Sequence, residues 1–421
     1  MRKRLGPKEP WLLGRTRWLV NPSGSDDPRA LDYCTLADDE MKELQRQMLP
    51  ITFPVSQDVP VGYPGEVTNL QTIACEIAKV LKLLYQDNEL RARALPSFIS
   101  DLVGNDDAIM AAVGFDFFVG RHLPYPVFIE AAAFGPEFIS TAKMAEFFGL
   151  RTLNERLSIW FLTLIKPCLG NVSSLFYVTS IGDWDFTREK EHEVLVPYLK
   201  TQGIDASFGP AEDKIALERE AIYLRIPIFS PMIWERLQRT KLWERIKNRQ
   251  VKVIPPLGNN FFSSKYWRPI LGSEKEMIRR GINSSTAKIV SRSMPLCFWL
   301  DDITLNLLKR VIAPDRPFYF KGIWNFGGYA TRGVFETEGI AKALREIGNM
   351  PVIVEEQVDF GFLAFDFGRN LPDRRIEVRV RVFDHPEGIK AMPASARVYL
   401  PATSYPFDSL YLGQELFPTK Q

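Results

Sequence analysis

RPFYFKGIWNFGGYATRGV, residues Arg316–Val334, is the stretch that says most about the fold of this chain. It predicts a short aromatic strand that ends on Lys321, followed by a loop that contains Gly327, Gly328 and Gly333, and then a helix. Glycines let backbone N–H groups approach an anion and a lysine adds a positive charge, so the arrangement is typical of a phosphate-binding loop. In a P-loop the lysine follows the last glycine, whereas here it comes first. A plain hairpin with a glycine turn is the alternative.

The composition excludes several classes of protein. The 421 residues are enough for two or three domains, and 46% hydrophobic and 25% charged residues are ordinary for a soluble globular protein. The net charge of +2, from 53 basic and 51 acidic residues, argues against a general nucleic-acid-binding protein. The longest strongly apolar run, near Leu157–Ile165, is far shorter than the ~20 residues that span a bilayer. We expect no nucleic-acid partner and no membrane partner, and no oligomeric state is indicated.

Cysteine and histidine usage points to a cytoplasmic protein without a histidine-rich metal site. The four cysteines, Cys34, Cys75, Cys168 and Cys297, are far apart and no pair has metal-ligand spacing. Reduced, buried thiols are therefore expected, which suits a cytoplasmic location. Three histidines in the whole chain are too few for a metal site built from histidines.

Two carboxylates stand in a pair of predicted strands near the middle of the first half. The strands are Phe115–Val119, which contains Asp116, and Val127–Glu130, which ends on Glu130. A carboxylate from each of two paired strands can hold Mg²⁺, because this hard cation prefers oxygen ligands. Two solvated carboxylates at the edge of a sheet are the alternative.

The surrounding segments predict an α/β domain. An irregular arm over residues 1–62 precedes a helix over Glu66–Tyr85, and residues 138–167 are helical and then strongly apolar. A strand at Leu175–Ser180, a helix at Arg188–Gln202 and a strand at Ala221–Ile228 then predict an open α/β domain over about residues 170–250. The domain has no G-x-G-x-x-G sequence, so a dinucleotide-binding fold is unsupported.

Further along, a lysine lies in a connector and carboxylates follow a buried strand. Lys265 follows two serines within residues 251–275, where an exposed loop charge is the alternative. After a helix over Glu336–Ile347, the strand Pro351–Val354 runs into Glu355-Glu356-Gln357-Val358. The backbone of such a hinge can hold an adenine while a carboxylate binds the ribose. The alternative is a strand that simply emerges into water.

Two arginines share one face of the last clear strand. In Ile376–Phe383, apolar residues alternate with Glu377, Arg379 and Arg381. Neighbouring arginines repel each other unless an anion or a carboxylate meets them, and a polyphosphate or an acyl phosphate would do so. A solvent-exposed face with Glu377 between the arginines is the alternative. A later strand holds Arg397.

Taken in order, these pieces resemble a known family. The strand that ends in lysine, then GGYATRGV, VIVEEQVD and a strand rich in arginine are similar to the nucleotide-binding half of ATP-grasp enzymes. Here the strand pair that ends in IEAAAFGP comes before the α/β domain. That order is similar to the circularly permuted ATP-grasp group that includes the synthetase domain of glutathionylspermidine synthase, and Ser263–Lys265 stands where that group has a connector lysine. The resemblance covers roughly residues 110–400.

The resemblance implies an α/β (α+β) fold of the circularly permuted ATP-grasp type, in which two small sheets clasp ATP beside a pre-grasp α/β domain. It implies an N-terminal arm and helical segment over residues 1–110 and a strand–helix part with the metal carboxylates over 111–168. The pre-grasp domain would span 169–260, and the ATP-binding lid, hinge and C-terminal strands 261–421. It also implies an ATP-dependent carboxylate–amine ligase that forms an acyl phosphate on an amino acid or peptide-like substrate.

Residue roles follow from the resemblance position by position. The phosphates of ATP would contact Lys265 and Lys321, and the lid loop would contain Gly327, Gly328, Arg332 and Gly333. The adenine and ribose would be held by Glu355, Glu356 and Val358. Mg²⁺ would be held by Asp116 and Glu130, and the transferring phosphoryl group would be stabilised by Arg379, Arg381 or Arg397.

Two positions depart from the family pattern. Its E-x-N reads Glu130-Ala131-Ala132 here, and alanine cannot coordinate a metal; Gly114 stands where an arginine commonly precedes Asp116 by two residues. Either Glu137 supplies the missing oxygen, or one metal is lost, or the protein is a catalytically degenerate nucleotide-binding or assembly subunit. An unrelated α/β binding protein with a chance glycine loop is the remaining alternative.

Overall fold

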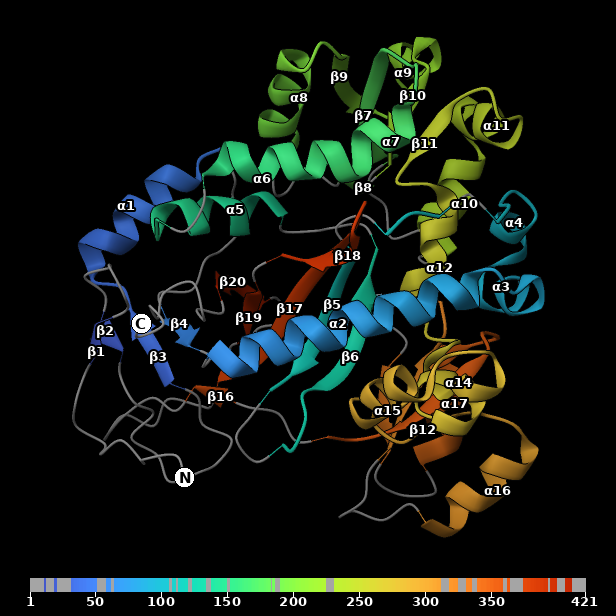
Figure 1. Ribbon diagram of the computed structural model, residues 1–421. Helices are drawn as coiled ribbons and strands as arrows, with labels where there is room; N and C mark the ends of the chain where they lie inside the picture. The colour runs from blue at the N-terminus through green and yellow to red at the C-terminus, as the bar shows by residue number, and fades with distance from the viewer. Residues whose placement is uncertain are drawn as a thin grey trace.

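The computed structural model describes most of the chain in three sheets with their helices, and two short antiparallel strand pairs near the N-terminus (Figure 1). The described residues are 11–12, 19–20, 32–50, 58–61, 64–105, 108–110, 113–119, 123–133, 138–149, 152–182, 184–185, 190–224, 231–311, 318–324, 331–334, 339–358, 362–363, 374–392, 394–399 and 406–410. The strand pairs are β1 (Trp11–Leu12) with β2 (Leu19–Val20), and β3 (Asp32–Thr35) with β4 (Asp58–Val61).

The central sheet joins segments from opposite halves of the sequence. Its main path runs β20-β19-β17-β5-β6, with β16 and β18 also paired to β17, and all pairings are antiparallel. The strands are β5 (Val113–Phe118), β6 (Val127–Ala132), β16 (Phe362–Leu363), β17 (Arg374–His385), β18 (Gly388–Ala391), β19 (Ser395–Tyr399) and β20 (Pro406–Leu410). The two strands predicted around Asp116 and Glu130 are confirmed as a neighbouring pair.

One long helix covers the apolar face of this sheet. Helix α2 (Pro64–Tyr85) runs along β17 and β18 and crosses the front of the central sheet in Figure 1. Its predicted stripe, Ile73, Ile77, Leu81 and Leu84, is almost completely buried. The stripe belongs to the same core as the alternate apolar residues of β5 and β17. The apolar residues that recur at helical spacing on α2 therefore pack against those at every second position of β5 and β17, and together they form the main core.

The segment predicted to be an open α/β domain contains a second sheet, which is five-stranded. Its strands β11, β10, β7 and β9 are parallel neighbours in that order, and β8 pairs with β7. They are β7 (Ser174–Ile181), β8 (Trp184–Asp185), β9 (Asp205–Pro210), β10 (Ala221–Tyr223) and β11 (Lys252–Ile254). The helix after β7, α8 (His192–Thr201), contains Pro197, and β10 ends earlier than predicted because its last partner in β11 is Ile254. Residues 225–230 lie outside the described residues.

Several helices surround the sheet formed by β7 to β11, in the upper part of Figure 1. They are α9 (Lys214–Glu218), α10 (Pro231–Gln238), α11 (Lys241–Lys247), α5 (Phe138–Phe147), α6 (Leu153–Trp160), a π-helical turn (Phe161–Ile165) and α7 (Lys166–Leu169). The apolar segment predicted near Leu157–Ile165 is part of a second core with β7 and α8. Helix α1 (Asp38–Met48) packs on α5, where Lys143 Nζ donates to the carbonyls of Gln47 at 2.9 Å and Met48 at 3.2 Å.

The stretch Arg316–Val334 contributes two strands to a separate four-stranded sheet, which we call the lid sheet. Its order is β12-β15-β13-β14, from β12 (Cys297–Trp299), β13 (Phe318–Gly322), β14 (Thr331–Val334) and β15 (Val352–Glu356). Two helices, α16 (Asp302–Val311) and α17 (Gly339–Ile347), supply the apolar residues that bury one face of the sheet against Phe318, Phe320 and Val354. β15 continues beyond the predicted end at Val354 to Glu356, so Glu355 lies in a strand rather than in a hinge loop.

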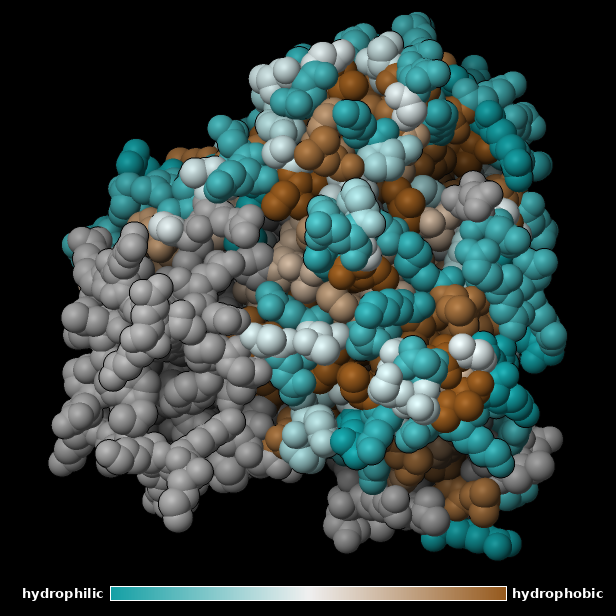
Figure 2. Space-filling model, in the orientation of Figure 1, coloured by the Kyte–Doolittle hydropathy of each residue, from teal (hydrophilic) through white to brown (hydrophobic). Residues whose placement is uncertain are grey.

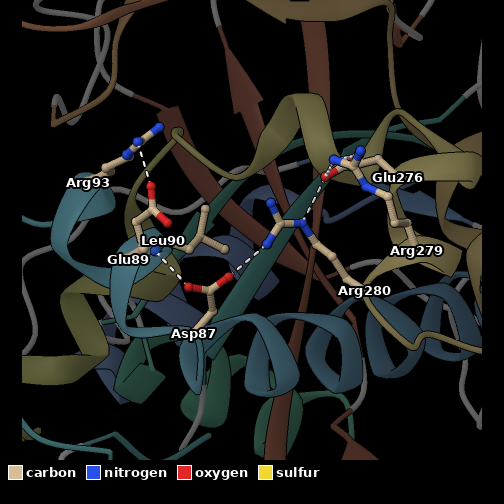
Figure 3. A network of polar contacts seen from close by, with 7 residues as sticks. All are labelled: Asp87, Glu89, Leu90, Arg93, Glu276, Arg279 and Arg280. Atoms are coloured by element: carbon tan, nitrogen blue, oxygen red, sulfur yellow. Dashed lines mark hydrogen bonds and ion pairs between the residues drawn. The ribbon is translucent and has the colours of Figure 1, made fainter.

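Short helices connect the lid sheet to the rest of the molecule. They are α3 (Asn88–Ala94), α4 (Ser97–Ser100), a 3₁₀ turn (Leu257–Asn259), α12 (Asn260–Ser263), α13 (Arg268–Leu271), α14 (Glu274–Arg279) and α15 (Ser284–Arg292). Figure 3 shows how α3 and α14 are joined: Asp87 accepts from the backbone of Leu90 at 3.0 Å and pairs with Arg280 at 2.8 Å, while Arg280 pairs with Glu276 at 3.0 Å. Trp324, which follows β13, donates to the carbonyl of Ala94 at 3.0 Å.

The visible surface is mixed in character. In Figure 2 the apolar residues appear in separate small areas between hydrophilic ones. Within the described part of the chain, no helix has the length and apolar character that a transmembrane span needs.

Candidate functional site

The lid sheet has one apolar face and one polar face, and the strand register decides which residues are on each. Glu355 lies opposite Tyr319 of β13 and opposite Cys297 of β12. Lys321 is two residues after Tyr319 and therefore shares its face. Because Phe318, Phe320 and Val354 point the other way, into the lid core, the lysine and the glutamate face away from that core.

Glu355 is bound by two cations on this polar face. Lys321 Nζ pairs with its Oε1, and Arg268 Nη2 lies 2.5 Å from its Oε2. The three side chains are buried, with exposed fractions of 9% for Lys321, 7% for Glu355 and 0% for Arg268. Burial alone would raise the pKa of Glu355, but the charges and hydrogen bonds of Arg268 and Lys321 outweigh it and lower that pKa below its ordinary value. Glu355 is therefore a carboxylate at neutral pH.

Arg268 joins the lid sheet to the central sheet. Its guanidinium donates to the carbonyl of Phe128 at 3.1 Å and to that of Ile129, and it lies 5.1 Å from the centre of the Phe128 ring. The register between β5 and β6 shifts beside Asp116, where Phe117 is opposite Phe128. A bulge of this kind leaves a residue out of the ladder, and Arg268 binds the carbonyls at that point.

Lys265 lies in the same cluster of charges. It is 6% exposed, and its backbone N–H donates to the carbonyl of Ile323, the residue after β13, at 3.0 Å. The pKa of Lys265 is lowered to about 8, mainly by burial and also by the charges of Lys321 and Arg268, which outweigh the raising effect of Glu130 and Glu355. The structure thus brings together Lys265 and Lys321, the two predicted phosphate-binding lysines, which are 56 residues apart in the sequence. The alternative of an exposed loop charge is wrong for Lys265.

The central sheet also presents a polar face, and the predicted metal and catalytic residues are in register there. Asp116 lies opposite both Glu130 and Arg379, and Gly114 lies opposite Arg381. The two oxygens of Asp116 accept hydrogen bonds from Nε and Nη2 of Arg379, each at 2.6 Å. Both side chains are buried, at 0% and 1% exposed. The alternatives of a solvated Asp116 and of a solvent-exposed arginine face are therefore wrong.

Gly114 gives the Arg379 side chain the space to reach Asp116. A Cβ atom at position 114 would lie 2.8 Å from Cδ of Arg379 and 3.0 Å from its Nε. The family pattern has an arginine at this position, whereas here an arginine from the neighbouring strand β17 lies over the glycine and binds Asp116. One departure from the pattern thus has a physical explanation.

The remaining predicted residues are distributed as follows. Arg381 is 3% exposed and donates to Ser395 Oγ at 3.0 Å, and Arg397 lies opposite Glu377 in the register of β17 and β19. Glu356 and Val358, at and after the end of β15, are half-buried. The prediction that Arg332 and Gly333 belong to the loop is wrong: both lie on strand β14, where pairing with β13 places them opposite Phe320 and Tyr319. Three further predictions lie outside the described residues: Gly327, Gly328 and Glu137.

The residues present fit a metal held largely by a ligand rather than by the protein. Among the described residues, no group of three or more His, Cys, Asp and Glu side chains is placed to hold a metal ion. Asp116 is bound through both oxygens by Arg379, and Ala132 brings no oxygen beside Glu130. Mg²⁺ is commonly bound through one or two carboxylates plus substrate phosphates, and Glu130 can serve as one such carboxylate. The role of Asp116 and Glu130 as metal ligands stays a prediction.

Sequence reasoning missed Arg268, which contacts Glu355 on the lid sheet and the carbonyls of Phe128 and Ile129 on the central sheet. It is an arginine in a short helix, three residues after Lys265, with no motif of its own. Its contacts are to residues more than 80 positions away, at Phe128 and Glu355. A local pattern cannot show such partners; only its closeness to Lys265 in sequence hints at the site.

Comparison with solved structures shows the fold. A glutathione synthetase-like effector, GSS30, from Globodera pallida in its apo form is similar with a TM-score of 0.56 and 10% identity, over 89% of this chain and 96% of that chain. Weaker likenesses are found to a gamma-glutamylcysteine synthetase-like protein from Methylobacillus flagellatus KT and to carboxyaminoimidazole ribonucleotide synthase from Aspergillus clavatus complexed with ATP. Their TM-scores are 0.43 and 0.30, with 11% and 14% identity, over 79% and 56% of this chain and 87% and 56% of theirs.

No protein-family model matches the sequence, and no curated protein matches it. The likeness to the effector covers nearly all of both chains. It shows that this chain has a fold like that of the effector.

Proposed function

We propose that this protein is an ATP-dependent ligase that joins a carboxylate to an amine through an acyl phosphate, on an amino acid or peptide-like substrate. The observation that carries the proposal is the gathering of Lys265, Lys321 and Arg268 between the lid sheet and the central sheet. Three cations are held there against two carboxylates, Glu355 and Glu130. The excess positive charge suits a polyphosphate. The glutathione synthetase-like name of the structural neighbour is in keeping with this chemistry.

The chemistry would depend on positioning and charge. Lys265 and Lys321 would bind the phosphates of ATP, and the loop between β13 and β14 would cover them. Arg381, held by Ser395 on the polar face of the central sheet, is the candidate for binding the transferring phosphoryl group. A Mg²⁺ ion, where bound beside Glu130, would neutralise phosphate charge. Fixing reactants in line and neutralising developing charge supply most of the rate of phosphoryl transfer.

A circularly permuted order of the ATP-grasp parts is also part of the proposal. It is supported by the pairing of β5 with β17, because the carboxylate strand comes early in the chain and the arginine strand comes late. The cytoplasmic location is proposed on the basis of cysteine chemistry: Cys75, Cys168 and Cys297 are free thiols.

Binding of nucleotide is the first test. Isothermal titration calorimetry with Mg-ATP should show one site in the wild type and none in Lys321→Ala, while Lys42→Ala, an exposed residue of α1, serves as the matched control. Absence of binding to the wild type would contradict the proposal.

A catalytically degenerate nucleotide-binding or assembly subunit is the second candidate. It is favoured by the Asp116–Arg379 pair and by Ala132, which leave few carboxylate oxygens for a metal. The two candidates differ in turnover. Release of ADP that depends on an added amino acid or peptide, followed by a coupled assay, would exclude the degenerate subunit; binding of ATP without any such release would favour it.

A further inference from the structure

Glu355 has an unusual position for a carboxylate in a site proposed to bind phosphates. It lies between Lys321, a proposed phosphate ligand, and Arg268, and it contacts both. A phosphate that approaches Lys321 therefore meets a lysine whose charge is already matched by a carboxylate. Opposite charges attract strongly in a buried site, so the strength of the Lys321–Glu355 contact affects how tightly a phosphate binds to Lys321.

The two cations that hold Glu355 differ in their freedom to move. Arg268 is fully buried and donates to two backbone carbonyls of β6 in addition to its contact with Glu355, so its position is fixed from three directions. Lys321 is on β13 near the start of the glycine-containing loop, and its Nζ lies 5.9 Å from the centre of the Tyr319 ring. A lysine has a flexible stem and three donor hydrogens, so its ammonium can turn to a new partner.

We propose that Glu355 is an internal counter-anion whose place on Lys321 is taken by a phosphate of the bound nucleotide, and that Arg268 is the positioning residue that makes this exchange possible. The inference rests on the proposed function, because it concerns the same site. Arg268 retains Glu355 when Lys321 turns away, so no carboxylate is left buried without a cation. A buried charge that loses its partner is strongly unfavourable, and the fixed arginine removes that cost.

The sharing of one carboxylate between two cations also sets the strength of the Lys321–Glu355 contact. With Arg268 present, the negative charge of Glu355 is divided between two partners. If Arg268 lost its charge, Lys321 would have to balance Glu355 without it. The Lys321–Glu355 contact would then be stronger and harder for a phosphate to separate. A phosphate carries more negative charge than a carboxylate and wins Lys321 only when that pair is weak enough.

The proposal predicts effects of opposite sign for two neighbouring residues. Glu355→Gln removes the competing charge and keeps the shape, so it should tighten binding of a non-hydrolysable ATP analogue by about tenfold. Arg268→Gln keeps amide donors for the β6 carbonyls but removes the charge, so it should weaken the same binding by about tenfold. In the double variant the carboxylate charge that Arg268 would share with Lys321 is absent, so the affinity should match that of Glu355→Gln alone.

Calorimetric titration with the ATP analogue and, in parallel, with adenosine tests these effects. Adenosine has no phosphate, so its affinity should not change in either variant. Glu43→Gln, which removes the carboxylate of the exposed Glu43–Arg46 pair on α1, is the matched control and should leave both affinities unchanged. Near-UV and far-UV circular dichroism establishes that each variant is folded.

Separate results overturn the inference and the proposed function. If the wild type binds the analogue but Glu355→Gln binds it equally or more weakly, the counter-anion role is wrong while the nucleotide site stands. If both variants lose analogue and adenosine affinity alike, the two residues are only structural. If the wild type binds no nucleotide, the proposed function fails and this inference fails with it. Glu355→Gln decides the matter even where Arg268→Gln does not fold.

Discussion

Two ion networks in this molecule have similar distances and very different surroundings. In the network between α3 and α14, Arg280 lies 2.8 Å from Asp87 and 3.0 Å from Glu276, and the side chains are 21–38% exposed (Figure 3). In the buried network, Arg268 lies 2.5 Å from Glu355, and both side chains are under 10% exposed. A pair that water and salt can reach in this way contributes about 0–1 kcal/mol, because they screen it.

The energetics of the buried network are different. Desolvation of each charge is costly, so well-packed apolar residues are often as stabilising as a buried ion pair, although removal of one partner from the pair is strongly destabilising. Charges kept at Lys321, Glu355, Arg268 and Lys265 are therefore poorly explained by stability alone. The partly exposed network joins α3 to α14, and the buried one is in keeping with the nucleotide site that we propose.

The largest effect is expected where a buried pair loses one member. Asp116→Ala should lower the free energy of unfolding by about 3–5 kcal/mol, because it removes the buried carboxylate that Arg379 binds through both Nε and Nη2. Urea denaturation followed by fluorescence measures the change. The double variant Asp116→Leu with Arg379→Met should recover most of the loss, and a loss that persists in it would show that packing rather than charge is responsible.

The buried lysine should make stability depend on pH in the alkaline range. Lys265 titrates near pH 8 when folded and near 10.5 when unfolded, so the unfolded chain binds more protons between these values. Its unfavourable contribution is complete below pH 8 and disappears as the pH rises to 10.5, by at most about 3 kcal/mol. The stability of Lys265→Met minus that of the wild type should fall over this window. A constant difference would contradict the lowered pKa.

A smaller loss is expected from the glycine beneath Arg379. Gly114→Ala places a methyl group within 2.8 Å of the arginine Cδ, and such overpacking costs about 1–3 kcal/mol. Gly272→Ala is the matched control, because its Cβ would meet its nearest neighbours at 3.7 Å, an ordinary contact. Equal unfolding free energies for the two variants would show that Arg379 can move aside.

The smallest effect is expected for the partly exposed network of Arg280. Arg280→Gln should change the free energy of unfolding by less than about 1 kcal/mol, and the change should shrink further in 1 M salt. Thermal unfolding at low and high salt measures it. A loss as large as that of Asp116→Ala would remove the distinction between the two networks.

Local patterns predicted the elements of this fold well, and the site less well. The stripe in α2 and the alternation in β17 are visible in sequence because burial of one face imposes a period. Lys265 and Lys321 could be placed together because the order of the motifs resembles a known family. The partners of Arg268 and the Asp116–Arg379 pair could not, since they depend on which strands are neighbours and in what register. The same lack of register information led to the alternative of solvent exposure for Arg379.

The pairing of β5 with β17 also has a consequence for how the chain acquires its fold. Asp116 and Arg379 contact each other across 263 positions of sequence, so the ends of a very long loop must meet before the central sheet exists. Contacts between residues so far apart slow folding, because the chain loses the entropy of closing the loop before the contacts can stabilise it. We expect the parallel domain and the lid sheet, which use nearer segments, to form first, and the proposed binding site to be completed only in the last step of folding. During synthesis the early strands β5 and β6 must wait for β17, and their uncovered edges are where misassembly is expected to begin.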